Sequence, residues 1–255
     1  MEPNNIEFPI DYDELYVAFV DILGFSALTF KSDRDSRIKL QRCIDRIDKL
    51  AEHFEVGRLK MLFISDAIIL SIPKDENSLA PLCQLIDGIQ NILLRIGLVS
   101  RGAISMGEAK ISSSDIKIFG PAYIQAFELE KRAAVFPRVI IDPKIFTHIT
   151  RTKLIQEVVS NGRQWLTSSE RSQSRRPFIH QDHFLFVDYL ITPILGKDIE
   201  AIDQIYEIVK NGLYSSKTWA IKYQWLKDYM LFSLNRFLDR DRQIFQPIYD
   251  RFVEL

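Results

Sequence analysis

Two aspartates stand at points of the chain where a carboxylate could hold a metal ion. Asp21 ends an apolar run that predicts a buried strand, and Gly24 follows it at a turn. Phe25 and Ser26 then open a helix, whose free backbone N–H groups suit a triphosphate. Asp66 lies between two strand-like runs so close together that only a tight hairpin can join them. Two such carboxylates predict a two-metal clamp, and their hard oxygen ligands favour Mg²⁺ or Mn²⁺.

Apolar periodicity predicts the elements that position these two acids. Short apolar runs predict strands, and apolar residues at three- and four-residue spacings predict helices. In chain order we expect a strand over 15–20, a helix over 36–54, strands over 59–64 and 67–72, a helix over 79–98 and a strand over 99–106. This order is the split βαβ arrangement of ferredoxin-like folds. We therefore predict an α/β (α+β) fold of βαββαβ order with helices on one face of the sheet.

The rest of the chain predicts further elements around this core. A helix over 120–132 and a strand over 139–141 follow, and the stretch 162–176 has the composition of a surface loop. The expected parts are a catalytic core over 1–142, a loop-rich extension with a late strand over 143–195, and an appendage of helices over 196–255.

Each of the two acids also has a simpler interpretation. Asp21 could cap the helix that follows it, and Asp66 could do no more than make a turn. Either explanation would be the better one for an isolated aspartate. Both acids together in this topology favour the metal site.

Composition argues against several classes of partner. The formal net charge is −1, which gives no general attraction to nucleic acid or to an anionic membrane. No apolar run approaches the roughly 20 residues that a membrane span needs, and the acidic start does not resemble a signal segment. We therefore expect a cytoplasmic protein with no nucleic-acid and no membrane partner. Cys43 and Cys83 fall in helical patterns, where free thiols are common.

Four stretches resemble motifs of the class III adenylyl and guanylyl cyclases, in the order that the family has them. Val17–Phe25 is similar to the metal-binding strand, an F-x-D-I-x-G-F pattern. Phe63–Ala67 resembles the hairpin, where Gly usually precedes the Asp. Arg101–Gly107 is similar to the R-x-G-I-x-x-G strand, and Ile118–Gly120 to the aromatic-Gly pair that starts the dimer-interface helix. Each match alone is weak, whereas the joint match is specific.

Within that superfamily, a second set of stretches looks like the bacterial pyrimidine cyclases of the Pycsar anti-phage system, which make cyclic UMP or cyclic CMP. These stretches are Val17–Leu28, Asp66, Arg101–Glu108 and Phe119–Glu130 with the pair Pro137–Arg138. The resemblance implies a homodimer with sites at the subunit interface, where Asp21, Asp66 and the carbonyl of Ile22 hold two Mn²⁺ or Mg²⁺ ions. Attack of the ribose 3′-hydroxyl on the α-phosphate would then release pyrophosphate. The product would be a second messenger for anti-phage defence, read by a separate effector protein.

The base-reading positions depart from the purine cyclases. They hold Leu62 and Lys117 here, and neither the adenine nor the guanine pattern fits. A lysine can only donate hydrogen bonds, which suits the carbonyl oxygens of uracil better than the amino group of cytosine. The expected substrate is therefore UTP, with CTP as the alternative. Lys60 leaves the assignment open because strand alternation puts it on the face of Leu62 and Asp66, and Lys117 could be an ordinary exposed residue.

The transition-state positions depart as well. The family's Asn and Arg on the interface helix fall at Ile124 and Glu128, and neither residue can do that work. The candidate replacements are polar residues of the same helix or of nearby strands: Gln125, Arg132, Arg101 and Arg138. An equally plausible interpretation makes Glu128 and Arg132 a surface pair at i, i+4.

Two rival functions remain. One is a catalytically dead cyclase-like domain that binds a nucleotide or a partner protein, and the retention of both acids argues against it. The other is a different two-metal palm enzyme, such as a diguanylate cyclase or a polymerase, whose hairpin signature is missing around Asp66.

Overall fold

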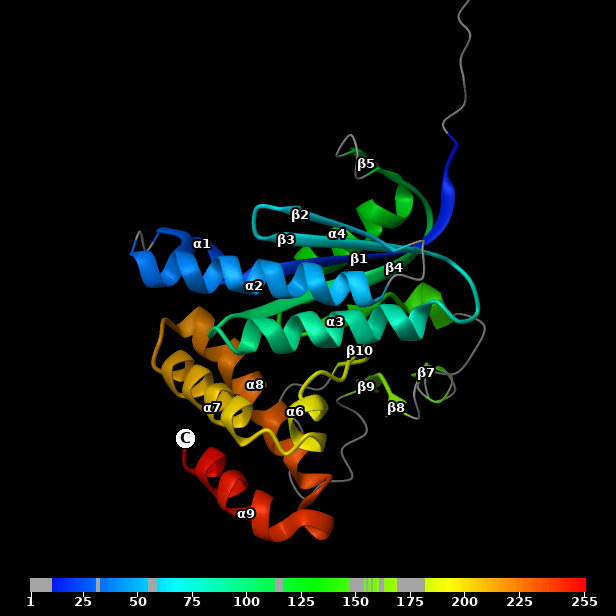
Figure 1. Cartoon of the computed structure of the whole chain (residues 1–255). Helices are drawn as coiled ribbons and strands as arrows, with labels where there is room; N and C mark the ends of the chain where they lie inside the picture. Colours follow the sequence, from blue (N-terminus) through cyan, green and yellow to red (C-terminus); the bar gives the residue numbers. More distant parts are fainter. Residues whose placement is uncertain are drawn as a thin grey trace, which may run out of the picture.

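A central sheet with helices on both sides forms the protein (Figure 1). The computed structural model describes residues 11–30, 33–54, 59–112, 117–146, 154, 156, 158–160, 163–168 and 182–255. The prediction of a surface loop over 162–176 is wrong for the part that is described, because 163–164 and 166–168 form short strands and the second of these is buried; the rest of 162–176 lies outside the described residues.

The strand order of the sheet is β2-β3-β1-β4-β6-β10-β9, and β5 pairs with β4 beside this path. The strands are β1 (Asp13–Leu23), β2 (Lys60–Ile64), β3 (Ala67–Pro73), β4 (Val99–Ser112), β5 (Lys117–Phe119), β6 (Val139–Ile141), β9 (Leu166–Ser168) and β10 (Leu185–Val187). β7 (Val159–Ser160) and β8 (Arg163–Gln164) form a separate pair. Neighbours from β2 to β4 are antiparallel, which is the ferredoxin-like arrangement. The predicted α/β class with a ferredoxin-like sheet is confirmed.

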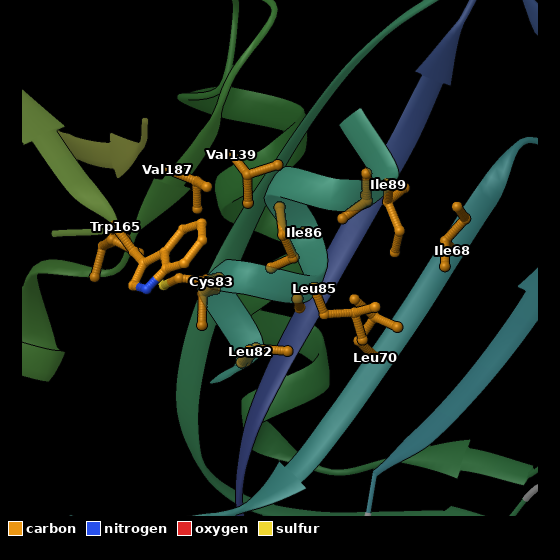
Figure 2. Packing of buried hydrophobic residues seen from close by; sticks show 14 of the residues in the cluster. Ile68, Leu70, Leu82, Cys83, Leu85, Ile86, Ile89, Val139, Trp165 and Val187 are labelled. Atoms are coloured by element: carbon orange, nitrogen blue, oxygen red, sulfur yellow. The ribbon is translucent and has the colours of Figure 1, made fainter. Parts of the chain in front are cut away.

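Helices α2 (Arg34–His53) and α3 (Leu79–Leu94) cover one face of this sheet. Figure 2 shows the apolar side chains of α3 against those of β3, with Leu85 beside Leu70. Alternation explains the contact, because Ile68 and Leu70 point to this face while Ile69 points to the other. Both cysteines are buried and free.

The opposite face is also covered, which corrects the expectation of helices on one face only. Helix α4 (Pro121–Arg132) packs there against β1 and β4, in a cluster that includes Phe19 and Ala126. Ala103 faces Phe19 in the strand register and so lies on the same side, further along the sheet. The physical reason is that β3, β4 and β6 bury side chains on both faces.

The C-terminal helices cover the remainder of that second face. They are α6 (Ile191–Leu195), α7 (Ile199–Leu213), α8 (Lys217–Asn235) and α9 (Leu238–Glu254). Trp225 and Tyr229 of α8 share one apolar cluster with Ala103, Ile140 and Phe186 of the sheet. The predicted appendage is therefore part of the core.

Shorter elements complete the fold. Helix α1 (Phe25–Phe30) follows β1, and a 3₁₀ turn (Pro143–Phe146) follows β6. β10 confirms the late strand expected in the extension, and its Phe186 pairs with Ile140 of β6. The sheet thus continues across residue 142, while the division into three parts stays a prediction. No helix within the described ranges has the length and apolar character to cross a bilayer.

Candidate active site

The hairpin between β2 and β3 brings Asp66 next to Asp21. The N–H of Ile22 donates a hydrogen bond of 2.8 Å to the carbonyl oxygen of Asp66, and Asp21 faces Ala67 in the strand register. Ser65 begins the turn with a φ of 57°, a left-handed conformation that favours glycine. Gly is the residue usual at this position in the cyclases that the hairpin resembles. Both acids are half-buried, so solvent reaches each of them.

Arg101 links Asp21 to a second acid that the sequence did not single out. Arg101 faces Asp21 across β1 and β4, and its Nε lies 3.0 Å from Oδ2 of Asp21. Its Nη2 lies 2.6 Å from Oε1 of Glu130 on α4. Burial raises the pKa of Glu130, and the charge of Arg101 opposes that shift. Asp21, Arg101 and Glu130, here called the site triad, form one ion-pair group between the sheet and α4.

Lys222 of α8 interacts electrostatically with all three residues of the site triad. Burial is the main cause that lowers the pKa of Lys222, and the charge of Arg101 lowers it further. The charges of Asp21 and Glu130 act in the opposite direction. The C-terminal helices therefore place a cation in the electrostatic field of the first predicted metal ligand. No pattern in the sequence pointed to Lys222, because its place depends on how α8 packs.

The carboxylates of Asp21 and Asp66 are suitable ligands for a divalent metal ion, although two side chains are fewer than a metal site made of protein groups alone would need. Within the described parts of the chain, no group of three or more His, Cys, Asp or Glu side chains is arranged to hold a metal. Mg²⁺ is commonly bound by one or two carboxylates together with substrate phosphates, so Asp21 and Asp66 suffice for that mode. An ion bound to Oδ2 of Asp21 would share or replace the ion pair with Arg101.

The expected phosphate-binding turn follows β1 directly. Gly24 has a φ of 86°, which favours glycine, and its carbonyl accepts the hydrogen bond of Leu28 that closes the first turn of α1. Phe25 is half-buried and Ser26 is exposed. The turn therefore lies at the same end of β1 as Asp21.

Of the expected base-reading residues, Leu62 and Lys60 share the sheet face that carries Asp21, whereas alternation in β5 turns Lys117 to the face opposite Ile118. Leu62 is 8% exposed and belongs to the cluster that includes Ile111 and Ile118. Lys60 donates a hydrogen bond of 2.7 Å from Nζ to the carbonyl of Ile111, so its ammonium group is already engaged. Lys117, next to Ile118, is exposed.

The other candidate cations divide between surface and core. Arg132 is 80% exposed and its Nε lies 2.6 Å from Glu128, which is the surface pair at i, i+4. Arg138 is 0% exposed, paired with Asp182, and its guanidinium lies 5.2 Å from the ring centroid of Phe186. A side chain enclosed in this way cannot reach a phosphate, so we leave Arg138 out of the site. Gln125 lies half-buried on α4.

Comparisons with known proteins give a weak likeness. No protein-family model and no curated protein matches the chain. Among solved structures, the guanylyl cyclase Cya2 is 11% identical with a TM-score of 0.45, covering 69% of this chain and 91% of its own. The adenylyl cyclase CyaB from P. aeruginosa is 15% identical with a TM-score of 0.43, covering 69% and 94%. Values this low carry no argument about what the chain binds or does.

Proposed function

We propose that the protein is a nucleotidyl cyclase, and specifically a uridylate cyclase that converts UTP to 3′,5′-cyclic UMP and pyrophosphate. The observation that carries this proposal is the hydrogen bond from Ile22 to Asp66, which holds two half-buried acids together at the open end of a ferredoxin-like sheet. The motif resemblance in residues 17–141 supplies the reaction class.

The chain's own residues have separable tasks in this reaction. Asp21, Asp66 and the carbonyl of Ile22 would hold two divalent ions, which lower the pKa of the attacking hydroxyl and neutralise the phosphates. Arg101 orients Asp21 through the 3.0 Å contact and keeps its charge balanced until substrate arrives. The turn at Gly24 would present backbone N–H groups to the phosphates.

A homodimer completes this proposal. Ile124 of α4 is 58% exposed and Ile64 of β2 is 40% exposed, so apolar side chains face solvent on the helix and the hairpin that the resemblance assigns to the interface. A second copy would cover them and contribute base or transition-state contacts. Gln125 is the candidate polar residue of α4 for such a contact, because it is next to Ile124, where the family has a transition-state residue. Sedimentation at the assay concentration tests this part, and an active monomer would contradict it.

The choice of UTP rests on the base-reading positions. A buried Leu62 and an exposed Lys117 offer neither purine pattern, and lysine donation favours uracil over cytosine. The first alternative is cytidylate cyclase activity, and the second alternative is a catalytically dead domain that binds a nucleotide. In the branch that the motifs resemble, the product would signal phage infection to a separate effector protein.

One experiment separates these possibilities. Purified protein is incubated with each of the four nucleoside triphosphates and Mn²⁺, and the products are identified by mass spectrometry. Cyclic UMP as the main product supports the proposal, cyclic CMP supports the alternative, and a purine product removes the pyrimidine assignment. If none forms while nucleotide still binds, the domain is a binding module.

Lys117→Ala sharpens the base assignment. A contact to the base that substrate and the second subunit enclose changes discrimination by roughly 5- to 150-fold, so kcat/KM for UTP relative to CTP should fall by a factor in that range. Lys110→Ala, on β4, is the matched control and should leave the ratio unchanged. An unchanged ratio in Lys117→Ala would remove this residue from base reading.

A further inference from the structure

A cavity of about 490 Å³ lies between the turn after β1 and the helices α7 and α8. Gly24 and Gly97 form part of its wall, with φ of 86° and 85°, so the sheet side of the cavity is backbone rather than side chain. A volume of this size is typical of small-molecule sites, which span about 300–1,000 Å³. The cavity shares only Gly24 with the proposed active site.

One wall of the cavity is aromatic and is held in place by packing. Trp219 and Tyr223 lie one turn apart on α8, with ring centroids 6.4 Å apart and planes inclined by 29°. A Cβ at Gly212 of α7 would lie 2.0 Å from the Tyr223 ring, so glycine is required for that ring to rest on the helix. The Nζ of Lys222 lies 4.5 Å from the ring centroid of Trp219. These rings offer a surface on which a flat ligand can stack.

Another wall is polar and comes from one face of α7. Gln204, Glu207 and Asn211 line the cavity at spacings of three and four residues. They present a carboxylate between two carboxamides, a set that accepts from N–H donors and can also donate to carbonyl oxygens. Nucleobase edges carry both kinds of group. None of the described residues lining the cavity is Lys, Arg or His, and the charge of Glu207 opposes a phosphate there.

We propose that this cavity is a binding site for a nucleobase or nucleoside without phosphate. The ring stacks on the Trp219–Tyr223 wall, and its edge of N–H donors meets Glu207. The carboxamides of Gln204 and Asn211 read the rest of the edge. The proposal goes beyond the cyclase function and does not depend on it.

Tryptophan fluorescence tests the proposal directly. The chain has three tryptophans, and Trp165 and Trp225 are 5% and 0% exposed, so a ligand in the cavity should quench Trp219. The probes are adenosine, guanosine, cytidine and uridine, each with its 5′-monophosphate. We expect at least one nucleoside to quench the emission and to bind in calorimetry, and its monophosphate to bind more weakly. Trp219→Phe should abolish the quenching and keep most of the calorimetric binding.

Paired variants show whether the ligand lies in the cavity. Glu207→Gln removes the charged acceptor and should weaken binding by about tenfold or more. Glu200→Gln, in the first turn of the same helix, is the matched control and should have no effect. Absence of binding by all four nucleosides, unchanged affinity in Glu207→Gln, or monophosphates that bind as tightly as nucleosides would overturn the proposal.

Discussion

Two groups of acids and arginines lie at different depths in this molecule. In the site triad, the side chains of Asp21 and Arg101 are 21% and 23% exposed, and only that of Glu130, at 6%, is buried. The second group joins the sheet and α3 to the C-terminal helices, and the side chains of its acids, Asp87 and Asp188, are 6% and 2% exposed. The chemical groups are alike, so the difference in burial should decide what each group does.

The buried acids have partners on several sides. The hydroxyl of Thr192 lies 2.7 and 2.9 Å from the two carboxyl oxygens of Asp87, and Arg163 lies 3.3 Å from one of them. Asp188 accepts from the Tyr229 hydroxyl at 2.6 Å and pairs with Arg236 at 2.7 Å. These contacts join the buried acids to α6 and α8, and the low exposure of the two carboxylates leaves little room for an incoming ion. An acid at the open end of the sheet can exchange Arg101 for an incoming ion.

The largest expected effect is on turnover when either half-buried acid of the site is removed. Asp21→Ala or Asp66→Ala removes a charged metal ligand, so cyclisation should fall by roughly 10³-fold or more. Because both side chains are half-buried, the unfolding midpoint in urea should change little. The control is Asp48→Ala on the exposed face of α2. Undiminished turnover in both variants, with metal still bound, would remove the two-metal assignment.

Asp188→Ala should have the opposite pattern, with a large effect on stability. The change leaves the buried Tyr229 hydroxyl without its acceptor and removes the partner of Arg236, which costs about 1–3 kcal/mol of the free energy of unfolding. Asp203→Ala is the matched control because Asp203 also pairs with an arginine, at 2.7 Å, while its side chain is 48% exposed. That exposed pair is worth less than about 1 kcal/mol. Equal losses in the two variants, measured by urea unfolding, would refute the contrast drawn from burial.

The buried acid Asp87 should make stability depend on pH. Burial raises the pKa of Asp87 to about 7, although Arg163 and Thr192 oppose the shift and Asp188 adds to it. In the unfolded chain an aspartate titrates near about 3.9. Between these values only the unfolded state releases the proton, so the contribution of Asp87 to stability falls as pH rises from about 4 to 7 and is level above that.

The variant Asp87→Asn isolates this contribution. Urea unfolding of both proteins between about pH 5 and pH 8 should show a wild-type curve that declines relative to the variant and then runs parallel to it. A relative stability that stays level over this window would show that the folded-state pKa of Asp87 is not raised.

Features that depend on a few neighbouring residues could be predicted from the sequence, and features that depend on contacts between distant segments could not. The order of the first strands and the pairing of Asp21 with Asp66 depend on local apolar periodicity and on a tight hairpin. Each of these patterns can be recognised within a few residues of the sequence. The second helical layer was missed because β6 and β10 are only three residues long, too short to show that both faces are buried.

Individual side chains were missed for a related reason. Arg138 is buried because its neighbour Phe136 and two rings from distant segments, Phe186 and Trp225, enclose it, each centroid within 5.6 Å of the guanidinium. Glu130 and Lys222 face Arg101 only after α4 and α8 have packed on the sheet. The spacing of residues along the chain cannot predict contacts of this kind.

The smallest expected effect concerns the turn that presents Asp66. Ser65 has a φ of 57°, where a Cβ is strained, while glycine adopts this conformation readily but loses more entropy on folding. The two terms nearly offset, so Ser65→Gly should raise the free energy of unfolding by about 0.5 kcal/mol, and Ser65→Val should lower it by more, since a β-branched residue is a poor fit at positive φ. Turnover should survive in Ser65→Gly because the hydrogen bond from Ile22 to Asp66 fixes the acid through its backbone. If Ser65→Gly is destabilising and Ser65→Val is neutral, the turn is not left-handed at this residue, and the placement of Asp66 beside Asp21 would have to be reconsidered.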